Sequence, residues 1–415
     1  MARAFTWSAG AVLLLFGTSA AVLAAVPRNE RWVGSWAAAQ QIPEPKDAAQ
    51  GEALRGGTLR QIVHLSAGGS MIRLRVSNAF GTGPLHLIAV HVAHPVSPTT
   101  SRIEPSSDVA VTFDERADVL IPAGAEYVSD PVSYTVAPLS DLAITLQIEA
   151  PPAQQTGHPG SRATSYLAAG VPVSAVEVPG AQAIDHWYFV SGVDVSAGSG
   201  AAAVVALGDS ITDGHGATTN GNDRWPDILA ARLQHTARTH AVSVLNAGLG
   251  GNRLLLDGSG PNALARFDRD VLAQNAVHYV IVLQGINDIG MLTRSNPAGE
   301  AQHDELVRKL IGAYQQIIRR AHAHGIEVIG GTVTPFTGSD FYHPGPANES
   351  DRQRVNAWIR APGHFDAVVD FDATIADPKH PDRMRSDFDC GDHLHPSPAG
   401  YRAMAEAIPL ELFRN

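Results

Sequence analysis

Apolar positions divide the chain into two halves with different periods. Between residues 32 and 195, short runs alternate between apolar and polar side chains, and Gly, Pro, Ser and Asp separate the runs. This alternation is typical of antiparallel strands joined by turns. We expect strands at residues 58–65, 71–76, 85–92, 109–113, 118–121, 131–136, 142–148 and 187–195. The Ala-Gly-Gly segment at 67–69 predicts a hairpin between the first two strands, and this half as a whole predicts an all-β sandwich or jelly roll.

From residue 203 onward the pattern changes to strand, loop and helix. Short runs rich in β-branched residues predict buried strands at residues 204–207, 242–245, 279–283, 326–333 and 367–371. Amphipathic segments predict helices at residues 225–235, 264–272, 305–324 and 398–413. Strands that alternate with helices in this way indicate a single α/β domain with a parallel sheet.

Three segments follow from these patterns. We expect a signal peptide at 1–25, the β-domain at 26–198 and the α/β domain at 199–415. Residues 151–179, which are rich in Pro, Gly, Ala and Ser, are predicted to be loop, and 196–200 a linker.

The first 25 residues have the composition of a cleaved signal peptide. Arg3 supplies a positive charge, and an apolar run follows it. Val-Leu-Ala at 22–24 resembles the small-residue motif at which signal peptides are cleaved. The alternative is a membrane anchor, but Gly17, Thr18 and Ser19 interrupt the apolar run and no basic flank follows it. The segment therefore predicts a secreted or periplasmic protein.

Amino-acid composition and net charge limit which disulfides and which classes of binding partner are expected. The 415 residues include one cysteine, Cys390, so no intramolecular disulfide can form, and no family signature marks this residue as a nucleophile. The net charge of −11, without clusters of Lys or Arg, argues against nucleic acid and against stable association with an anionic membrane. The sequence leaves the oligomeric state open.

Ser210 is the first candidate for chemistry. It follows the strand at 204–207, at the edge of a parallel sheet where ligands bind, and backbone N–H groups at a helix start could stabilise an oxyanion there. The alternative is a helix cap, because an Asp-Ser pair such as Asp209-Ser210 is common at turns and helix starts.

Two further stretches follow later strands. Residues 246–253 (NAGLGGNR) contain three glycines that let a ligand approach the backbone, although a plain connector would look the same. The glycines do not match a dinucleotide fingerprint, and no cofactor is expected. In residues 284–288 (QGIND), the amide of Asn287 offers uncharged donors for an oxyanion, or alternatively forms an Asx-turn.

An acidic and histidine-rich stretch precedes the last helix. In residues 392–396 (DHLHP), Asp392 and His395 are spaced so that the carboxylate can orient the imidazole as a base. A metal site made by Asp392, His393 and His395 is the alternative, but the chain has neither an HExxH motif nor a cysteine pair.

Together these four stretches resemble the SGNH hydrolases, also called the GDSL esterase/lipase family. GDSIT at 208–212 is similar to the nucleophile block, NAGLGG to the glycine block, QGIND to the asparagine block and DHLHP to the Asp-x-x-His block. The resemblance extends from residue 203 to the end of the chain. It implies a flavodoxin-like parallel sheet.

The resemblance also implies a role for each matched residue. Ser210 would be the nucleophile, His395 the base and Asp392 the group that orients His395. The backbone N–H groups of Ser210 and Gly251 and the side chain of Asn287 would form the oxyanion hole.

Two alternatives to these assignments stay open. Gly250 could replace Gly251 as a donor, although the glycine of the family falls five residues after the asparagine of its block, here Asn246. His393, four residues after Asp389, is the alternative base, but the Asp-x-x-His spacing and the following proline favour His395.

The expected function is that of an exported serine esterase acting on small acyl esters, with acetyl groups on carbohydrate as the first candidate. An SGNH domain preceded by a β-sandwich looks like the secreted esterases that deacylate plant polysaccharides. A lipase or phospholipase is the alternative, although residues 213–224 and 337–351 are polar or rich in Gly and Pro. A carbohydrate-binding protein without activity is a third reading, which the intact set of motif residues argues against. The expected partner is thus a small-molecule or polysaccharide ester.

Overall fold

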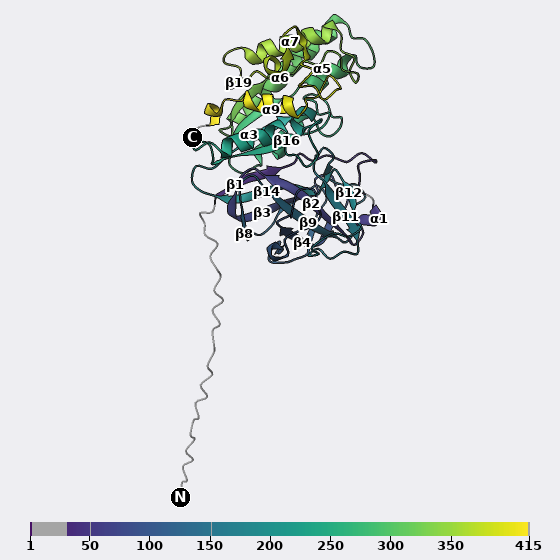
Figure 1. The fold of residues 1–415 in the computed structure, drawn as a ribbon, viewed down its shortest axis with the longest axis vertical. Coiled ribbons are helices and arrows are strands. Elements are labelled where there is room, and N and C mark those ends of the chain that lie inside the picture. Colours follow the sequence, from purple (N-terminus) through teal and green to yellow (C-terminus); the bar gives the residue numbers. More distant parts are fainter. Residues whose placement is uncertain (2–30, 50, 151, 414–415) are drawn as a thin grey trace. The chain divides into compact units, whose positions relative to one another are not determined.

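A five-stranded parallel sheet forms the centre of the C-terminal half (Figure 1). The computed structural model describes residues 1, 31–49, 51–150 and 152–413. The strands lie in the order β16-β15-β17-β18-β19. Their bounds are β15 (Ala202–Gly208), β16 (Val242–Gly248), β17 (Val277–Leu283), β18 (Glu327–Gly331) and β19 (Ala367–Val369). This is the 2-1-3-4-5 order of flavodoxin-like folds, so the predicted fold class of this half is confirmed.

Helices follow each of the parallel strands. They are α2 (Ser210–Asp213), α3 (Trp225–Gln234), α4 (Ala263–Phe267), α5 (Ile286–Thr293), α6 (Glu300–His322), α7 (Pro346–Arg360), α8 (Phe371–Ile375) and α9 (Pro398–Glu406). The last two, α8 and α9, come after the final parallel strand β19. Two predicted helices change form along their length. The one expected at 264–272 continues from α4 as a π turn over Asp268–Leu272, and the one expected at 398–413 ends as a separate 3₁₀ turn at Leu410–Phe413.

No helix is expected from the sequence at α7, because polar side chains form much of the buried face of this helix. Its buried residues include Asn348, Asp351, Arg352 and Asn356, and so the apolar period that marks a helix is weak. Their hydrogen bonds satisfy these groups. Arg352, for example, donates to the backbone oxygen of Val333 at 2.9 Å. Polar contacts therefore replace part of the apolar packing here.

The N-terminal half consists mainly of two antiparallel sheets, as predicted. One sheet has the order β1-β14-β3-β7, with β8 also on β3, and the other has the order β12-β11-β2-β9-β4-β5, with β6 also on β4. Their bounds are β1 (Arg31–Ala37), β2 (Gly57–Leu65), β3 (Gly69–Ser77), β4 (Leu85–Ala93), β5 (Val109–Val111), β6 (Val119–Ile121), β7 (Glu126–Val128), β8 (Val132–Val136), β9 (Ser140–Ile148), β11 (Ser165–Ala169), β12 (Gln182–Ile184) and β14 (Val190–Ala197). A short pair, β10 (Gly157–His158) and β13 (Trp187–Tyr188), and the helical turn α1 (Gly51–Leu54) complete this half.

Two predictions for this half are wrong. Strands β2 and β3 do not form a hairpin, since β2 pairs with β9 and β11 whereas β3 pairs with β14, β7 and β8. The chain crosses between the sheets after β2, where both the backbone N–H and the hydroxyl of Ser66 donate to the backbone oxygen of Ser35. Residues 151–179 are also not all loop, because β10 and β11 lie within them.

Residues from Arg31 onward form one compact unit, and the two halves share a buried apolar cluster. Strand β1 of the N-terminal half packs on β16 of the C-terminal half. The Ser243 hydroxyl donates to the Gly34 oxygen at 2.6 Å, and the Val244 N–H donates to the Ser66 hydroxyl at 3.0 Å. The boundary at 198/199 falls between β14 and β15, and the division into separate domains stays a prediction.

The proposed signal peptide at 1–25 lies outside the described residues apart from Met1. Among the helices that the structure does describe, none combines the length and the apolar character needed to span a membrane.

Candidate active site

Ser210 lies just beyond the carboxyl end of strand β15, which pairs with β16 on one side and β17 on the other. The strand is buried along its whole length, and Asp209 follows it as the cap of α2, with its carboxylate accepting from the Ile211 N–H at 3.0 Å. Ser210 is therefore the first residue of the helix and not its cap. Burial raises the pKa of Asp209 to about 7, and the nearby carboxylate of Asp288 adds to this effect.

Three predicted residues form one hydrogen-bonded chain. The Ser210 Oγ lies 2.8 Å from the Nε2 of His395, and the Nδ1 of His395 lies 2.6 Å from the Oδ2 of Asp392. The other oxygen of Asp392 accepts from the backbone N–H groups of Leu394 at 3.0 Å and His395 at 2.8 Å. Partial burial favours the neutral acid, but the hydrogen bonds and the charge of His395 outweigh it and hold the pKa of Asp392 well below its usual range. The carboxylate can therefore orient the imidazole, as in a catalytic triad.

His393 is held elsewhere. Its side chain is more than half exposed, and its Nδ1 lies 2.6 Å from the Oδ2 of Asp389. The structure thus brings His395, and not His393, to the hydroxyl of Ser210.

The two candidate glycine donors differ in their partners. The Gly250 N–H donates to the Oδ2 of Asp213 at 3.1 Å. Gly251 has a φ of 69°, in the left-handed region that favours glycine, and within the described residues its N–H meets no acceptor. Both glycines line the cavity at Ser210. The free N–H of Gly251 fits the predicted oxyanion donor better than the engaged one of Gly250.

Asn287 is fixed at the start of α5. Its amide nitrogen donates to the Asn252 backbone oxygen at 2.7 Å, and its amide oxygen accepts from the Tyr342 hydroxyl at 2.5 Å. One N–H of the amide therefore remains for a ligand, and Asn287 lines the same cavity as Ser210.

These groups surround a cavity of about 560 Å³. The residues that line it are Ser210, His215, Gly250, Gly251, Asn287, Ser339, Asp340, Phe341, Tyr342, Asp392, Leu394 and His395. Phe341, Tyr342 and Leu394 provide an apolar wall, while the polar groups gather around the serine. A nucleophile, a base and N–H donors that meet in one cavity can carry out acyl transfer.

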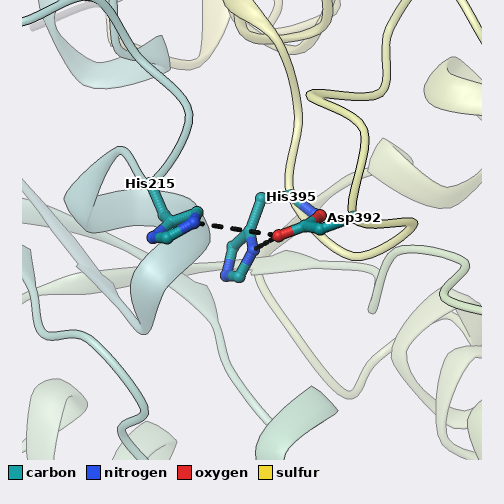
Figure 2. A group of neighbouring side chains, drawn as sticks. All are labelled: His215, Asp392 and His395. Atoms are coloured by element: carbon teal, nitrogen blue, oxygen red, sulfur yellow. Dashed lines mark hydrogen bonds and ion pairs between the residues drawn. The ribbon is translucent and has the colours of Figure 1, made fainter. Parts of the chain in front are cut away.

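His215, which the sequence analysis did not single out, packs directly on His395. The ring centroids are 4.0 Å apart, and the Nε2 of His215 lies 3.7 Å from the Oδ2 of Asp392 (Figure 2). Burial, followed by the positive charges of His395 and Arg162, lowers the pKa of His215 to about 4. The ring is therefore neutral near pH 7. It covers one side of the catalytic imidazole.

The groups of side chains that could hold a metal ion differ from the alternative metal site considered from the sequence. Of the described residues, His215, Asp392 and His395 can bring one ligand atom each within 4.8 Å of one another, and so can Asp389, Cys390 and Asp392. His393 belongs to neither group. The three residues of the alternative metal site, Asp392, His393 and His395, therefore do not form a group of this kind in the described structure.

We expect the hydrolysis of p-nitrophenyl acetate to be insensitive to EDTA. The oxyanion donors are N–H groups, and the Nδ1 of His395 already bonds to Asp392. Activity is measured before and after dialysis against the chelator, and again after addition of Zn²⁺ or Mg²⁺. Loss of activity with the chelator and its return with a metal would contradict the triad.

A second residue that the sequence did not reveal, His158, supports the glycine loop from the N-terminal half. Its Nε2 lies 2.8 Å from the Oδ1 of Asp213, whose other oxygen accepts from Gly250. Its Nδ1 lies 2.7 Å from the Ala39 backbone oxygen, so both ring nitrogens face oxygen atoms. The side chains of His158 and Asp213 are almost fully buried, and a Cβ on Gly160 would collide with the Asp213 carboxylate. A close contact between the two halves thus fixes the loop that carries Gly250 and Gly251.

His158→Gln is expected to lower kcat by up to about 100-fold and to change KM much less, because small displacements of a donor weaken transition-state binding. Glutamine cannot reach both oxygen atoms with the geometry of the ring. Steady-state kinetics with p-nitrophenyl acetate would show the effect.

The matched control is His91→Gln. His91 belongs to another His–Asp pair of the N-terminal half, in which its Nδ1 lies 2.9 Å from the Oδ2 of Asp108, far along the chain from the site residues. Equal losses of kcat in both variants would mean that His158 acts only through global stability.

A parallel α/β sheet with this chain of side chains at its carboxyl edge is the arrangement of a carboxylic ester hydrolase. Residues 206–403 match the sequence profile of the GDSL-like lipase/acylhydrolase family, and this segment belongs to that family. The resemblance found in the motifs is therefore confirmed, and the enzyme class is carboxylic ester hydrolase. No curated protein is similar enough in sequence to match the chain.

Solved structures of the same kind are similar to about half of the chain. A G-D-S-L family protein from Desulfitobacterium hafniense is 22% identical, covering 49% of this chain and 96% of its own, with a TM-score of 0.38. A GDSL-like lipase from Bacteroides thetaiotaomicron is 20% identical, covering 49% and 84%, with a TM-score of 0.35. An acetyl xylan esterase, AlAXEase, is 20% identical, covering 49% and 96%, with a TM-score of 0.36.

Proposed function

We propose that the protein is an exported serine esterase that removes small acyl groups, acetyl first among them, from carbohydrate esters. The observation that supports it best is the chain from the Ser210 Oγ through His395 to Asp392, with distances of 2.8 Å and 2.6 Å. The charge of −11 and the absence of basic clusters in the sequence favour an ester substrate over a nucleic-acid partner. Export is supported by the composition of residues 1–25.

The geometry suggests how the reaction proceeds. His395 takes the proton of the Ser210 hydroxyl as the oxygen attacks the ester carbonyl, and Asp392 stabilises the imidazolium that forms. The N–H groups of Ser210 and Gly251 and the amide of Asn287 bind the oxyanion. His395 then protonates the leaving alcohol. Water repeats the sequence on the acyl-enzyme, releases the acid and restores the serine.

A lipase-type activity on longer acyl chains is the second candidate. The apolar wall of Phe341, Tyr342 and Leu394 and the cavity of about 560 Å³ favour it, because acetyl alone would leave much of this space empty. Phe341 is half exposed at this wall. The length of the preferred acyl chain therefore decides between the two candidates.

A series of p-nitrophenyl esters from acetate to palmitate, assayed beside acetylated xylan, tests the proposal. We expect kcat/KM to be highest for acetate and butyrate and to fall as the chain lengthens, and we expect acetate to be released from xylan. A maximum at ten or more carbons would favour the lipase. No turnover of any ester would contradict both candidates.

A further inference from the structure

Ser210 lies where two cavities of different character meet. Besides the cavity with the apolar wall, a second one of about 280 Å³ reaches Ser210, and both share His215 and Gly250. The residues that line the second cavity are Gln41, Glu44, Lys46, Asp47, Pro159, Gly160, Arg162, Ser210, Asp213, His215, Leu249, Gly250 and Ser259. Its first seven lining residues come from the N-terminal half, and five of these are polar or charged. An ester also has two parts that diverge from the carbonyl carbon, the acyl group and the alcohol.

One positive charge of this second cavity has no acidic partner. Its three carboxylates each face a basic side chain: Glu44 faces Lys46 at 3.3 Å, Asp47 faces His186 at 3.6 Å and Asp213 faces His158 at 2.8 Å. By contrast, Arg162 makes no ion pair with any residue that the structure describes. In a protein of net charge −11, an unpaired guanidinium in a cavity that also reaches Ser210 can attract an anion.

Arg162 is held in place by the loop around it. Its φ of 49° lies in the left-handed region, which is costly for a residue with a side chain. Its backbone oxygen accepts from the Asn220 N–H at 2.8 Å, and its guanidinium donates to the Nδ1 of His215 at 3.2 Å. The Nε of Arg162 is buried and has no hydrogen-bond partner among the described residues. The guanidinium is thus held against His215, which packs on His395, and its Nη1 has no hydrogen-bond partner among the described residues.

We propose that the second cavity binds the alcohol part of the substrate and that Arg162 binds a carboxylate on that part. The substrates would be acylated sugar acids or glycans that contain uronic acids. A guanidinium and a carboxylate form charge-assisted and often bidentate hydrogen bonds. The acyl group would lie in the other cavity, whose wall is apolar. This inference rests on the proposed esterase function and specifies its substrate.

A matched pair of substrates tests it. The two substrates are methyl glucuronoside and methyl glucoside, each acetylated at the same hydroxyl. They differ only at C6, where the glucuronoside has a carboxylate and the glucoside has a hydroxymethyl group. We expect the wild-type enzyme to prefer the glucuronoside in kcat/KM by about tenfold or more, which is the usual effect of a hydrogen bond to a charged group. The preference should shrink as the salt concentration rises. A wild-type enzyme without this preference would overturn the inference.

For each variant, the ratio of kcat/KM for the glucuronoside to kcat/KM for the glucoside is compared. Absolute rates are not compared, because Arg162 also contacts His215. Arg162→Gln is expected to abolish the preference, and Arg162→Lys to retain part of it, since lysine keeps the charge without the planar fork. Arg238→Gln is the control, because Arg238 is exposed and lies before the start of β16, at the opposite end of that strand from the site. An unchanged ratio in Arg162→Gln, or an equal fall in Arg238→Gln, would overturn the assignment.

A second substrate pair locates the carboxylate. Phenyl hydrogen succinate and phenyl butyrate differ by a carboxylate on the acyl side, and we expect no Arg162-dependent preference between them. Such a preference on the acyl side alone would overturn the placement of the alcohol. Hydrolysis of p-nitrophenyl acetate that depends on Ser210 tests the esterase itself, so the two proposals can fail separately.

Discussion

Ser210→Ala is expected to lower kcat for every ester substrate by about 10⁴-fold or more, because no other group can form the acyl-enzyme. The Ser210 hydroxyl bonds to the His395 Nε2 and is not part of the buried core. Asp209 caps α2 through its own carboxylate, and so the helix does not need the serine side chain. The variant should therefore fold and still bind substrate.

Initial rates with p-nitrophenyl acetate measure this loss, while circular dichroism and the melting temperature check the fold. Ser199→Ala, at an exposed serine between β14 and β15, is the matched control and should keep wild-type rates. A folded Ser210→Ala variant with more than about a tenth of the wild-type kcat would rule out the serine mechanism.

The C-terminal sheet could be predicted from the sequence because its strands are buried on both faces. The apolar runs at 204–207 and 279–283 read as strands without further information, and they correspond to β15 and β17. The motifs then fall at the carboxyl ends of these strands, where the structure also places Ser210 and Asn287. Local patterns are sufficient for this part of the site.

Strand pairing in the N-terminal half could not be predicted in the same way. Alternation shows that 58–65 and 71–76 are strands, but it does not specify their partners. The contacts of Ser66 with Ser35 and of Val244 with Ser66 link residues far apart in the chain. No strand was predicted at β11, because the Gly and Pro residues around it are typical of loops.

Supporting residues of the site lacked any local signal for the same reason. His158 and Asp213 are 55 positions apart, and Arg162 and His215 are 53 apart. Neither His158 nor Arg162 belongs to a motif, and each acts across the junction of the two halves. Point substitutions test such residues better than removal of residues 31–198, because removal would expose the β16 surface that packs on β1.

The two histidines of the DHLHP stretch should differ sharply when each is replaced. His395→Ala is expected to lower kcat about as much as Ser210→Ala, because nucleophile and base act as a unit. The double variant should for the same reason be no slower than either single one. His393→Ala should lower kcat by at most a few-fold. The His393 ring is more than half exposed and bonds to Asp389, outside the cavity at Ser210.

Kinetics of the three variants with p-nitrophenyl acetate and with an acetylated sugar would measure this ranking. Both histidines lie in one loop and each pairs with an aspartate at 2.6 Å, so each serves as the structural control for the other. A general loss of loop order would affect both variants alike. The reverse ranking would make His393 the base and Asp389 its partner, and the 2.8 Å contact between Ser210 and His395 would then have no catalytic role.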